Sequence, residues 1–375
     1  MTEQALGAAV PKKNVNDELN LSEIFNCSDL LIGTMQAPTS DGASFIPQIN
    51  ASYVFTKDAL NEILLYLAHP LNDCLYISGP SGCGKTSQVL QVAARLNWGV
   101  EQLTLSNKTE SMELIGHMNL RNGRLEFEYG PLARAMKYGE ILILNEIDLM
   151  APGDLSALND VLEGKPLTVV ANNGEVIMPH PFFRVIATAN TKGNGDSVGF
   201  YNGARLLNQA FLDRWRFLEM SYPYPKAELS IIRSCCPSID EALAKELVRF
   251  AGELRRVSLG DPEADDSAES QLSAPFTTRT LIRIATLMSI SSRISVQQAV
   301  SIAYAMRLPK VEREYVLRLC NDVFGHAAGT SENTDGDKQN SSGAEDSAAG
   351  LSEDLDAAGK VARAKRKSSV KKKAE

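Results

Sequence analysis

Short apolar runs alternate with stretches of helical periodicity between residues 51 and 221. Each run is too short for a typical helix and is bounded by turn-forming or polar residues, a pattern that is typical of β-strands. The predicted strands are 74–79, 101–105, 140–145 and 183–190, and the predicted helices are 58–67 and 85–96. This alternation favours βαβ units around a mostly parallel sheet, so the predicted fold class is α/β over residues 51–221.

A β-hairpin is predicted within this α/β domain, in the segment 167–179. Asn173 and Gly174 separate two apolar runs there. This dipeptide favours the tight turn of a hairpin because both central positions of that turn take positive φ. We expect the hairpin to project from the sheet.

Strand-like patterns end near Pro223, and four later segments show the helical spacing of apolar residues. These segments are 226–235, 238–257, 278–292 and 295–308. A second, all-α domain is therefore expected over 222–328. Before the α/β domain, residues 1–50 mix polar residues with Pro and Gly. We expect an extension there, in which only short apolar stretches such as 30–32 pack on a core.

Composition is globular overall but uneven near the carboxyl-terminal end. The chain has 375 residues with 38 Lys and Arg against 46 Asp and Glu, a net charge of −8, which excludes collagen-like and wholly disordered proteins. Residues 260–270 are acidic without apolar periodicity, which favours a solvated loop. Residues 331–359 are acid-rich, whereas 360–375 carry eight Lys or Arg and one Glu. We expect a disordered tail over 329–375, whose basic end either binds nucleic acid or neutralises the acidic stretch.

Several classes of site are disfavoured by the sequence. No apolar run approaches the ~18 residues of a membrane span, and the start of the chain lacks the order of a signal peptide, so a cytoplasmic location without membrane contact is expected. The six cysteines form no CxxC pair, which disfavours a disulfide scaffold or a zinc site. The four histidines are scattered, at 69, 117, 180 and 326, and are expected to be structural or solvated.

One motif carries phosphate-binding chemistry and lies between a predicted strand and a predicted helix. It reads Gly79-Pro80-Ser81-Gly82-Cys83-Gly84-Lys85-Thr86, followed by Ser87, and satisfies GxxxxGK[ST]. In such a P-loop, glycines let backbone N–H groups surround phosphate oxygens, Lys85 reaches the β and γ phosphates, and Thr86 ligates Mg²⁺. The motif predicts binding of ATP with Mg²⁺. Cys83 is either a redox thiol or, as we favour, a small residue at a variable loop position.

The predicted strand 140–145 ends in Asn145 and is followed by Glu146. Glu146 is placed to polarise a water towards the γ-phosphate, while the preceding residue, usually Asp, holds the Mg²⁺ shell. Asn145 offers a neutral amide oxygen instead, so weaker metal affinity or slower turnover is expected. Asp148 either compensates for this lost charge or caps a helix just past the strand, and we favour the cap.

Two further polar residues belong to the candidate site. Asn190 ends the predicted strand 183–190 and is placed to orient the attacking water. Arg214 lies near the end of a predicted helix. It either pairs with Asp213 or stabilises the charge of a transferring phosphate, two alternatives that the sequence leaves open.

These elements, in this order, resemble the AAA+ ATPases. The residues Leu114, Ile115, Gly116, Gly123, Phe127, Gly130, Pro131, Leu132, Ala135 and Gly139 resemble the helix-2 insert region of the MoxR branch. Within that branch, residues 91–98, Gly195, Asp196, Gly199, Tyr201, Gly203, 208–209 and 213–215 are similar to the ATPase subunits of aerobic cobaltochelatase (CobS). The resemblance covers roughly residues 45–326.

The resemblance implies a P-loop AAA+ fold with an αβα core around a parallel sheet, followed by an all-α lid. It implies that Asn190 is the sensor 1 residue and that Arg214 is an arginine finger reaching the ATP of a neighbouring subunit in a ring, usually a hexamer. Arg279 resembles the sensor 2 arginine of the lid, although the family more often has Ser-Pro before it. Asn173 and Gly174 become the tip of the pre-sensor 1 hairpin, which contacts partners or substrates.

The expected function is that of a ring ATPase that remodels a partner protein. Among specific roles, the resemblance favours first a cobaltochelatase subunit, which inserts cobalt into a corrin precursor with a CobT-like von Willebrand factor A (VWA) partner and a large chelatase subunit. The second role is a MoxR-type chaperone with a VWA-domain partner in metallocofactor or complex assembly. A third is a slow ATPase that holds a ring scaffold together, with a nucleic-acid-binding tail. No residue is assigned to cobalt or to a tetrapyrrole.

Overall fold

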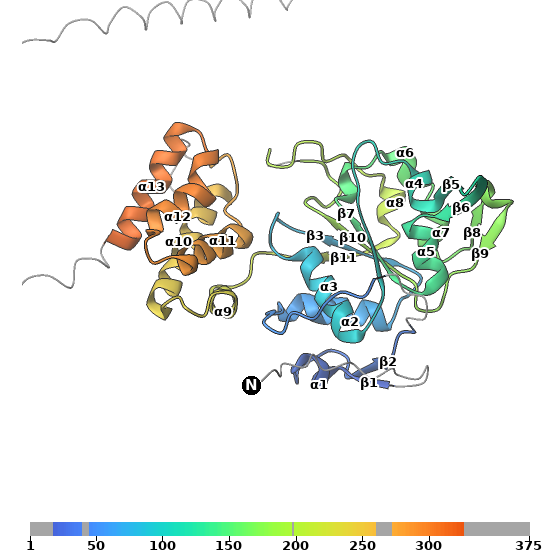
Figure 1. The fold of residues 1–375 in the computed structure, drawn as a ribbon, viewed down its shortest axis with the longest axis horizontal. Helices are drawn as coiled ribbons and strands as arrows, with labels where there is room; N and C mark the ends of the chain where they lie inside the picture. The colour runs from blue at the N-terminus through green and yellow to red at the C-terminus, as the bar shows by residue number, and fades with distance from the viewer. Residues whose placement is uncertain (1–17, 40–44, 197–198, 260–271, 326–375) are drawn as a thin grey trace, which may run out of the picture. The chain divides into compact units, whose positions relative to one another are not determined.

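A computed structural model describes residues 18–39, 45–196, 199–259 and 272–325 (Figure 1). The predicted tail over 329–375 and the predicted acidic loop over 260–270 lie outside the described residues. Within the described ranges, no helix is both long and apolar enough to span a membrane.

Five parallel strands form the central sheet, in the order β11-β3-β10-β7-β4. The strands are β3 (Cys74–Ser78), β4 (Val100–Thr104), β7 (Ile141–Asn145), β10 (Arg184–Ala189) and β11 (Trp215–Glu219). The four strands predicted from the sequence are confirmed to within a residue or two. β11 was not predicted, because it is a short edge strand of the sheet and Arg216 interrupts its apolar pattern. β3 and β10 are neighbours, but the helix after β3 covers one face of the sheet and the helix after β10 covers the other, which is the kind of switch point where α/β sheets bind ligands.

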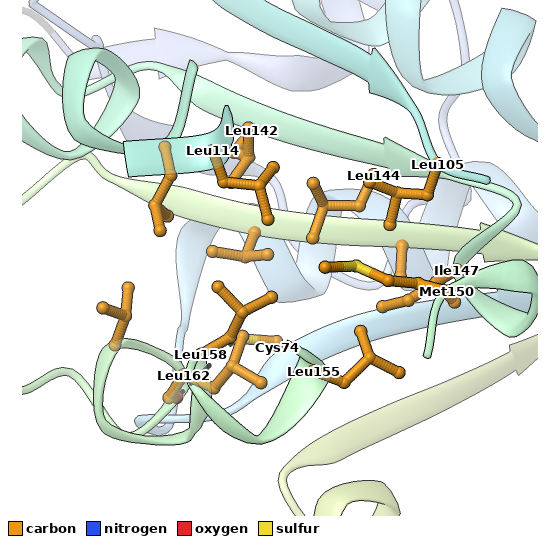
Figure 2. Close-up of a cluster of buried hydrophobic side chains, with 14 of the residues drawn as sticks. Cys74, Leu105, Leu114, Leu142, Leu144, Ile147, Met150, Leu155, Leu158 and Leu162 are labelled. Atoms are coloured by element: carbon orange, nitrogen blue, oxygen red, sulfur yellow. Dashed lines mark hydrogen bonds between the residues drawn. The ribbon is translucent and has the colours of Figure 1, made fainter. Parts of the chain in front are cut away.

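Helices cover both faces of the sheet, which gives the expected αβα core. One face carries α2 (Lys57–Ala68) and α3 (Lys85–Leu96), and the other carries α4 (Ser111–Ile115), α5 (Pro131–Tyr138), α6 (Pro152–Ser156), α7 (Asn159–Leu162) and α8 (Gln209–Leu212). β7 shows why the strands read as continuous apolar runs. Its Ile141 and Ile143 join the cluster under α2 and α3, while Leu142 and Leu144 join the opposite cluster. Figure 2 shows this second cluster, with side chains of β7 and of the α6–α7 segment gathered together.

Two small antiparallel hairpins accompany the core. The predicted hairpin is present as β8 (Leu167–Val169) and β9 (Glu175–Ile177), with a short 3-10 helix, η2 (Val170–Asn172), in its loop. Asn173 and Gly174 have the expected positive φ, 55° and 73°, but they end a longer loop over 170–174 instead of forming a two-residue turn. A second hairpin, β5 (Gly116–Arg121) with β6 (Arg124–Tyr129), was not predicted. Its turn also carries an Asn-Gly pair, Asn122 and Gly123, the same signal that identified the first hairpin.

In the all-α region, the described residues form five helices around a third apolar cluster. They are α9 (Pro225–Cys235), α10 (Glu241–Leu259), α11 (Thr278–Ile290), α12 (Val296–Ala303) and α13 (Lys310–Gly325), with a short 3-10 helix, η3 (Ala305–Arg307), before α13. Phe276 is buried in this cluster and contacts the rings of Phe250 and Tyr304 edge to face. α13 was not predicted as a separate helix, because it buries mainly Val316, Cys320 and Val323.

The amino-terminal segment is more ordered than the sequence indicates. β1 (Glu18–Asn20) and β2 (Thr34–Gln36) pair antiparallel around α1 (Leu21–Phe25). Leu19, Leu21 and Met35 are buried in the same cluster as α2 and α3. The expectation that only stretches such as 30–32 pack on the core was too narrow, because three or four isolated apolar residues produce no clear period in the sequence.

Candidate nucleotide-binding site

The P-loop follows β3 and leads directly into α3, so it lies at the carboxyl edge of the sheet. Gly82 has φ of 72°, and an added Cβ would lie 2.8 Å from Cβ of Thr277, the residue that caps α11. An added Cβ on Gly79 would lie 2.0 Å from the carbonyl oxygen of Met220. Only glycine fits these positions, and the resulting tight cradle, at the amino-terminal end of α3, suits a phosphate group.

Lys85 is held inside this loop. Its Nζ donates to the carbonyl oxygens of Gly79 (2.7 Å) and Pro80 (3.1 Å) and to Oδ1 of Asn190 (3.0 Å). Only 8% of the residue is exposed, and burial lowers the pKa of its ammonium group. The predicted phosphate-binding lysine is therefore already oriented by three acceptors.

Glu146 and Asn190 meet because β7 and β10 are neighbours in the parallel sheet. Nδ2 of Asn190 donates to Oε2 of Glu146 over 2.7 Å. Burial raises the pKa of Glu146, and the nearby Asp148 carboxylate raises it further. Lys85, Asn190 and Glu146, which are far apart in the sequence, thus form one hydrogen-bonded network beside the P-loop.

Asn145 ends β7 and lies beneath Thr86. Its Oδ1 accepts from the hydroxyls of Thr86 (2.7 Å) and Thr188 (3.0 Å). Its Nδ2 is buried and has no hydrogen-bond partner among the described residues. Because Thr86 donates its proton to Asn145, the lone pairs of its hydroxyl oxygen remain free for a cation. Thr86 therefore fits a Mg²⁺ ligand, and Asn145 supports it as a neutral acceptor.

The predicted helix cap at Asp148 is wrong. The chain after β7 forms a single 3-10 turn, η1 (Ile147–Leu149), with Asp148 inside the turn and no side-chain cap. The Asp148 carboxylate is buried and its Oδ2 accepts from the backbone N–H (3.1 Å) and hydroxyl (2.8 Å) of Thr191. Asp148 thereby joins the segment after β7 to the segment after β10, and its charge acts on Glu146.

Arg214 lies at the amino-terminal ends of the parallel strands, whereas the P-loop of the same chain lies at their carboxyl-terminal ends. It precedes β11, whose first residue Trp215 is in register with Cys74, the first residue of β3, whereas the P-loop follows the last residue of β3. Five strand residues separate the two levels, roughly 15 Å. The partner of Arg214 is Glu163 rather than Asp213: its Nε donates to Oε1 over 2.8 Å, and a second bond goes to the carbonyl of Ala210.

A cavity of about 340 Å³ adjoins the P-loop. Apolar and polar side chains share its lining, including Val54, Cys83, Gln88, Ile231, Arg279 and Ile282. Arg279 comes from the first turn of α11, so the structure places the predicted sensor 2 residue beside the P-loop. Cys83 is buried and burial raises the pKa of its thiol, which favours a packing role over a redox role.

Three tyrosines contact the P-loop and were not assigned a role from the sequence. The hydroxyl of Tyr201 accepts from the backbone N–H of Ser81 (3.3 Å), and the hydroxyl of Tyr222 donates to the carbonyl of Ser81 (3.2 Å). The hydroxyl of Tyr53 lies 3.2 Å from that of Ser87. In the sequence, Tyr201 belongs only to the residues that resemble the CobS subunits. Tyr53 is marked only by a second aromatic residue nearby, Phe55, just before α2.

Comparison with known proteins agrees with this geometry. Residues 75–214 match the model of the AAA domain (dynein-related subfamily), and residues 228–312 match that of the CbbQ/NirQ/NorQ C-terminal region. Over these two segments the chain is similar to the MoxR-like AAA+ proteins. The first match covers the sheet from β3 to the residue before β11, and the second covers the lid from α9 into α13. Both the predicted family and the predicted AAA+ P-loop fold are thereby confirmed.

Two relatives with known names are similar to this chain over most of their length. It is 29% identical over 291 residues to the aerobic cobaltochelatase subunit CobS of a Sinorhizobium species, covering 76% of this chain and 85% of that protein. It is 27% identical over 239 residues to NorQ of Paracoccus denitrificans, covering 64% and 82%. Among solved structures, the RuvB branch-migration motor of Thermotoga maritima is 15% identical with a TM-score of 0.42, covering 68% of this chain and 72% of that one.

Proposed function

We propose that this AAA+ protein binds ATP with Mg²⁺, hydrolyses the γ-phosphate and uses the cycle to remodel a partner protein. The hydrogen-bonded network of Lys85, Asn190 and Glu146 beside the P-loop is the observation that carries this proposal. It joins a phosphate-binding cation, a water-positioning amide and a carboxylate base, the three groups that phosphoryl transfer to water needs.

Binding is attributed to the P-loop and the adjoining cavity. Backbone N–H groups of residues 79–87, apart from Pro80, and the ammonium of Lys85 bind the phosphates, and the 340 Å³ cavity is suited to the nucleoside. Thr86 holds Mg²⁺ directly, with Asn145 behind it, and this ion neutralises phosphate charge when it is bound. Arg279 approaches the same phosphates from the lid.

Hydrolysis is attributed to Glu146, held by Asn190. One carboxylate oxygen of Glu146 accepts from Asn190, so the other remains to take a proton from the attacking water. Asn190 also bonds to Lys85, which fixes the amide orientation: its oxygen faces the ammonium and its nitrogen faces the carboxylate. The base is therefore positioned relative to the group that binds the γ-phosphate.

Glu146→Gln tests this assignment. The variant keeps the side-chain size and the hydrogen bond to Asn190 but removes the base, so we expect ATP binding to remain and hydrolysis to fall by about 10²-fold or more. Binding is measured with a fluorescent ATP analogue and hydrolysis by phosphate release. Glu126→Gln, at an exposed position of β6, is the matched control and should behave as wild type. Wild-type turnover in Glu146→Gln would contradict the assignment of Glu146 as the base.

The protein is further proposed to act as a ring, usually a hexamer in this family, with Arg214 reaching the nucleotide of the next subunit. The position of Arg214 supports this proposal because it lies at the opposite end of the strands from its own P-loop. A VWA-domain protein is the proposed partner, and the likeness to CobS favours a role beside a large chelatase subunit in cobalt insertion.

Asn145 supports a second candidate function. A neutral residue beneath Thr86 is compatible with slow hydrolysis, in which bound nucleotide mainly stabilises a ring scaffold. Purified protein should be assayed for ATP turnover alone, with a VWA-domain protein, and with a large chelatase subunit, a cobalt salt and a corrin precursor. Stimulated turnover with cobalt insertion supports the chelatase role, stimulated turnover alone supports the chaperone role, and binding without turnover supports the scaffold.

A further inference from the structure

A buried ion pair joins three helices of the lid. Arg255 on α10 donates through Nη1 and Nη2 to the two carboxylate oxygens of Glu228 on α9, both over 2.8 Å. The Arg255 side chain is 10% exposed and that of Glu228 is 2% exposed. The hydroxyl of Thr278, the first residue of α11, donates to the same carboxylate (2.7 Å) and accepts from Arg255 (3.3 Å). Nε of Arg255 donates to the carbonyl of Phe276 over 2.9 Å, so all three guanidinium nitrogens donate hydrogen bonds.

The same arginine reaches the P-loop through one aromatic residue. The guanidinium of Arg255 stacks over the ring of Tyr222, 4.2 Å from its centre. The hydroxyl of that ring donates to the carbonyl of Ser81 in the P-loop. A second contact lies alongside, because Gly82 of the P-loop packs directly against Thr277, the cap of α11. The start of α11 is thus connected to the P-loop both by direct packing and through Tyr222 and Arg255.

We propose that Arg255, with Glu228, Tyr222 and Thr278, forms a relay that positions Arg279 against nucleotide held in the P-loop. Arg279 directly follows Thr278, so the group that orients Thr278 also sets the start of the helix that carries Arg279. This inference rests on the proposed binding of ATP by the P-loop but does not depend on hydrolysis.

The chemistry of the pair supports a positioning role over a purely stabilising one. Burying two charges costs solvation energy that their attraction offsets only in part, and apolar replacements of buried pairs are often as stable. A bidentate arginine–carboxylate pair instead fixes direction, because the planar guanidinium bonds in a rigid fork. Here that fork is aligned by Glu228, Phe276 and Tyr222 at once.

Thr278→Val tests the relay without removing either charge. The variant keeps the side-chain shape but deletes the hydroxyl that links Arg255 and Glu228 to α11, so we expect ATP binding to weaken about fivefold. The measurement is the Kd of a fluorescent ATP analogue, which requires no turnover. Thr286→Val, an exposed position on the same helix, is the matched control and should bind as wild type.

The decisive comparison repeats Thr278→Val in an Arg279→Ala background. If the relay acts through Arg279, the valine variant should change Kd no further there, and Tyr222→Phe should couple to Thr278→Val rather than add to it. A fivefold loss that persists without Arg279, or wild-type affinity in Thr278→Val, would overturn the relay. Wild-type protein that binds ATP but never hydrolyses it would contradict the proposed ATPase function and leave this test valid. Wild-type protein that binds no nucleotide would overturn both.

Discussion

Asn145 differs from the aspartate usual at the end of this strand by one terminal atom and one negative charge. Its oxygen serves Thr86 and Thr188, while its nitrogen is buried and has no hydrogen-bond partner among the described residues. An aspartate would accept the same two hydrogen bonds and would place an anion where the amide nitrogen now lies. The site therefore keeps the geometry of a metal-supporting acceptor but lacks its charge.

Asn145→Asp should raise the affinity of the nucleotide site for Mg²⁺. Charge-assisted hydrogen bonds are about twice as strong as neutral ones, so we expect half-maximal binding of an ATP analogue at about tenfold lower Mg²⁺ concentration. The measurement is a Mg²⁺ titration at fixed nucleotide, which is independent of turnover. Asn107→Asp adds the same charge at an exposed position and serves as the control. Identical titrations for Asn145→Asp and wild type would show that the lost charge has no effect on metal binding.

At the scale of elements, a polar cluster connects the two hairpins to α5. The hydroxyl of Tyr129, at the end of β6, donates to Glu175 at the start of β9 over 2.6 Å. Lys137 of α5 donates to both residues, and Asn172 of η2 donates to Glu175 over 2.6 Å. Leu120 and Leu125, next to the turn of the β5–β6 hairpin, are 67% and 68% exposed, so apolar packing does not hold the tip of that hairpin.

Tyr129→Phe should lower the free energy of unfolding by about 1 kcal/mol, because it deletes a hydrogen bond to a charged group that is partly exposed. Denaturant unfolding measures the change, with Tyr224→Phe at an exposed position as the control. No loss of stability in Tyr129→Phe would mean that the hairpins are held by other contacts.

The effect should also depend on pH. The hydrogen bond from Tyr129 makes the largest contribution to lowering the pKa of Glu175 below its ordinary 4.5. Its contribution is therefore present above pH 4.5 and disappears as the pH falls through the lowered pKa. The difference between variant and wild type should shrink over that acidic range.

At the scale of the whole molecule, the two edges of the sheet carry different parts of the proposed catalytic set. The P-loop, Glu146 and Asn190 follow the carboxyl ends of β3, β7 and β10. Arg214 precedes β11 and so lies at the amino-terminal ends of the strands. Glu163 holds Arg214 in place within the same chain. Within one copy of the protein, Arg214 can reach its own P-loop only if the pairing of β11 with β3 is broken. If Arg214 contacts nucleotide, that nucleotide is therefore bound by a neighbouring copy.

Mixed assemblies of two inactive variants test this arrangement. Arg214→Ala subunits keep Glu146, and Glu146→Gln subunits keep Arg214. If Arg214 acts between subunits, an equal mixture should regain hydrolysis at about a quarter of the interfaces of a closed ring. Phosphate release before and after mixing measures this recovery, and each variant alone is the control. A mixture that stays as inactive as its components would contradict the shared site.

Much of the site was predictable because its signals are local. The P-loop, β3, β7, β10 and α3 each have their pattern within a few consecutive residues, and parallel strands necessarily bring the ends of β7 and β10 to one edge. That geometry alone placed Glu146 and Asn190 together. The AAA+ family followed from the order of these motifs, and the hairpin at Asn173 and Gly174 followed from its turn residues.

Tertiary structure decided the partners of these residues. Arg214 bonds to Glu163, 51 positions away, instead of to adjacent Asp213, and Asp148 bonds to Thr191 instead of capping a helix. The choice of a partner depends on which elements pack together, and a charged side chain bonds to the best-placed group that packing supplies. Arg255, Tyr222 and Ser81 are connected for the same reason. The sequence by itself determined the fold and the phosphate-binding chemistry, whereas only packing decided which distant side chains hold that chemistry in position.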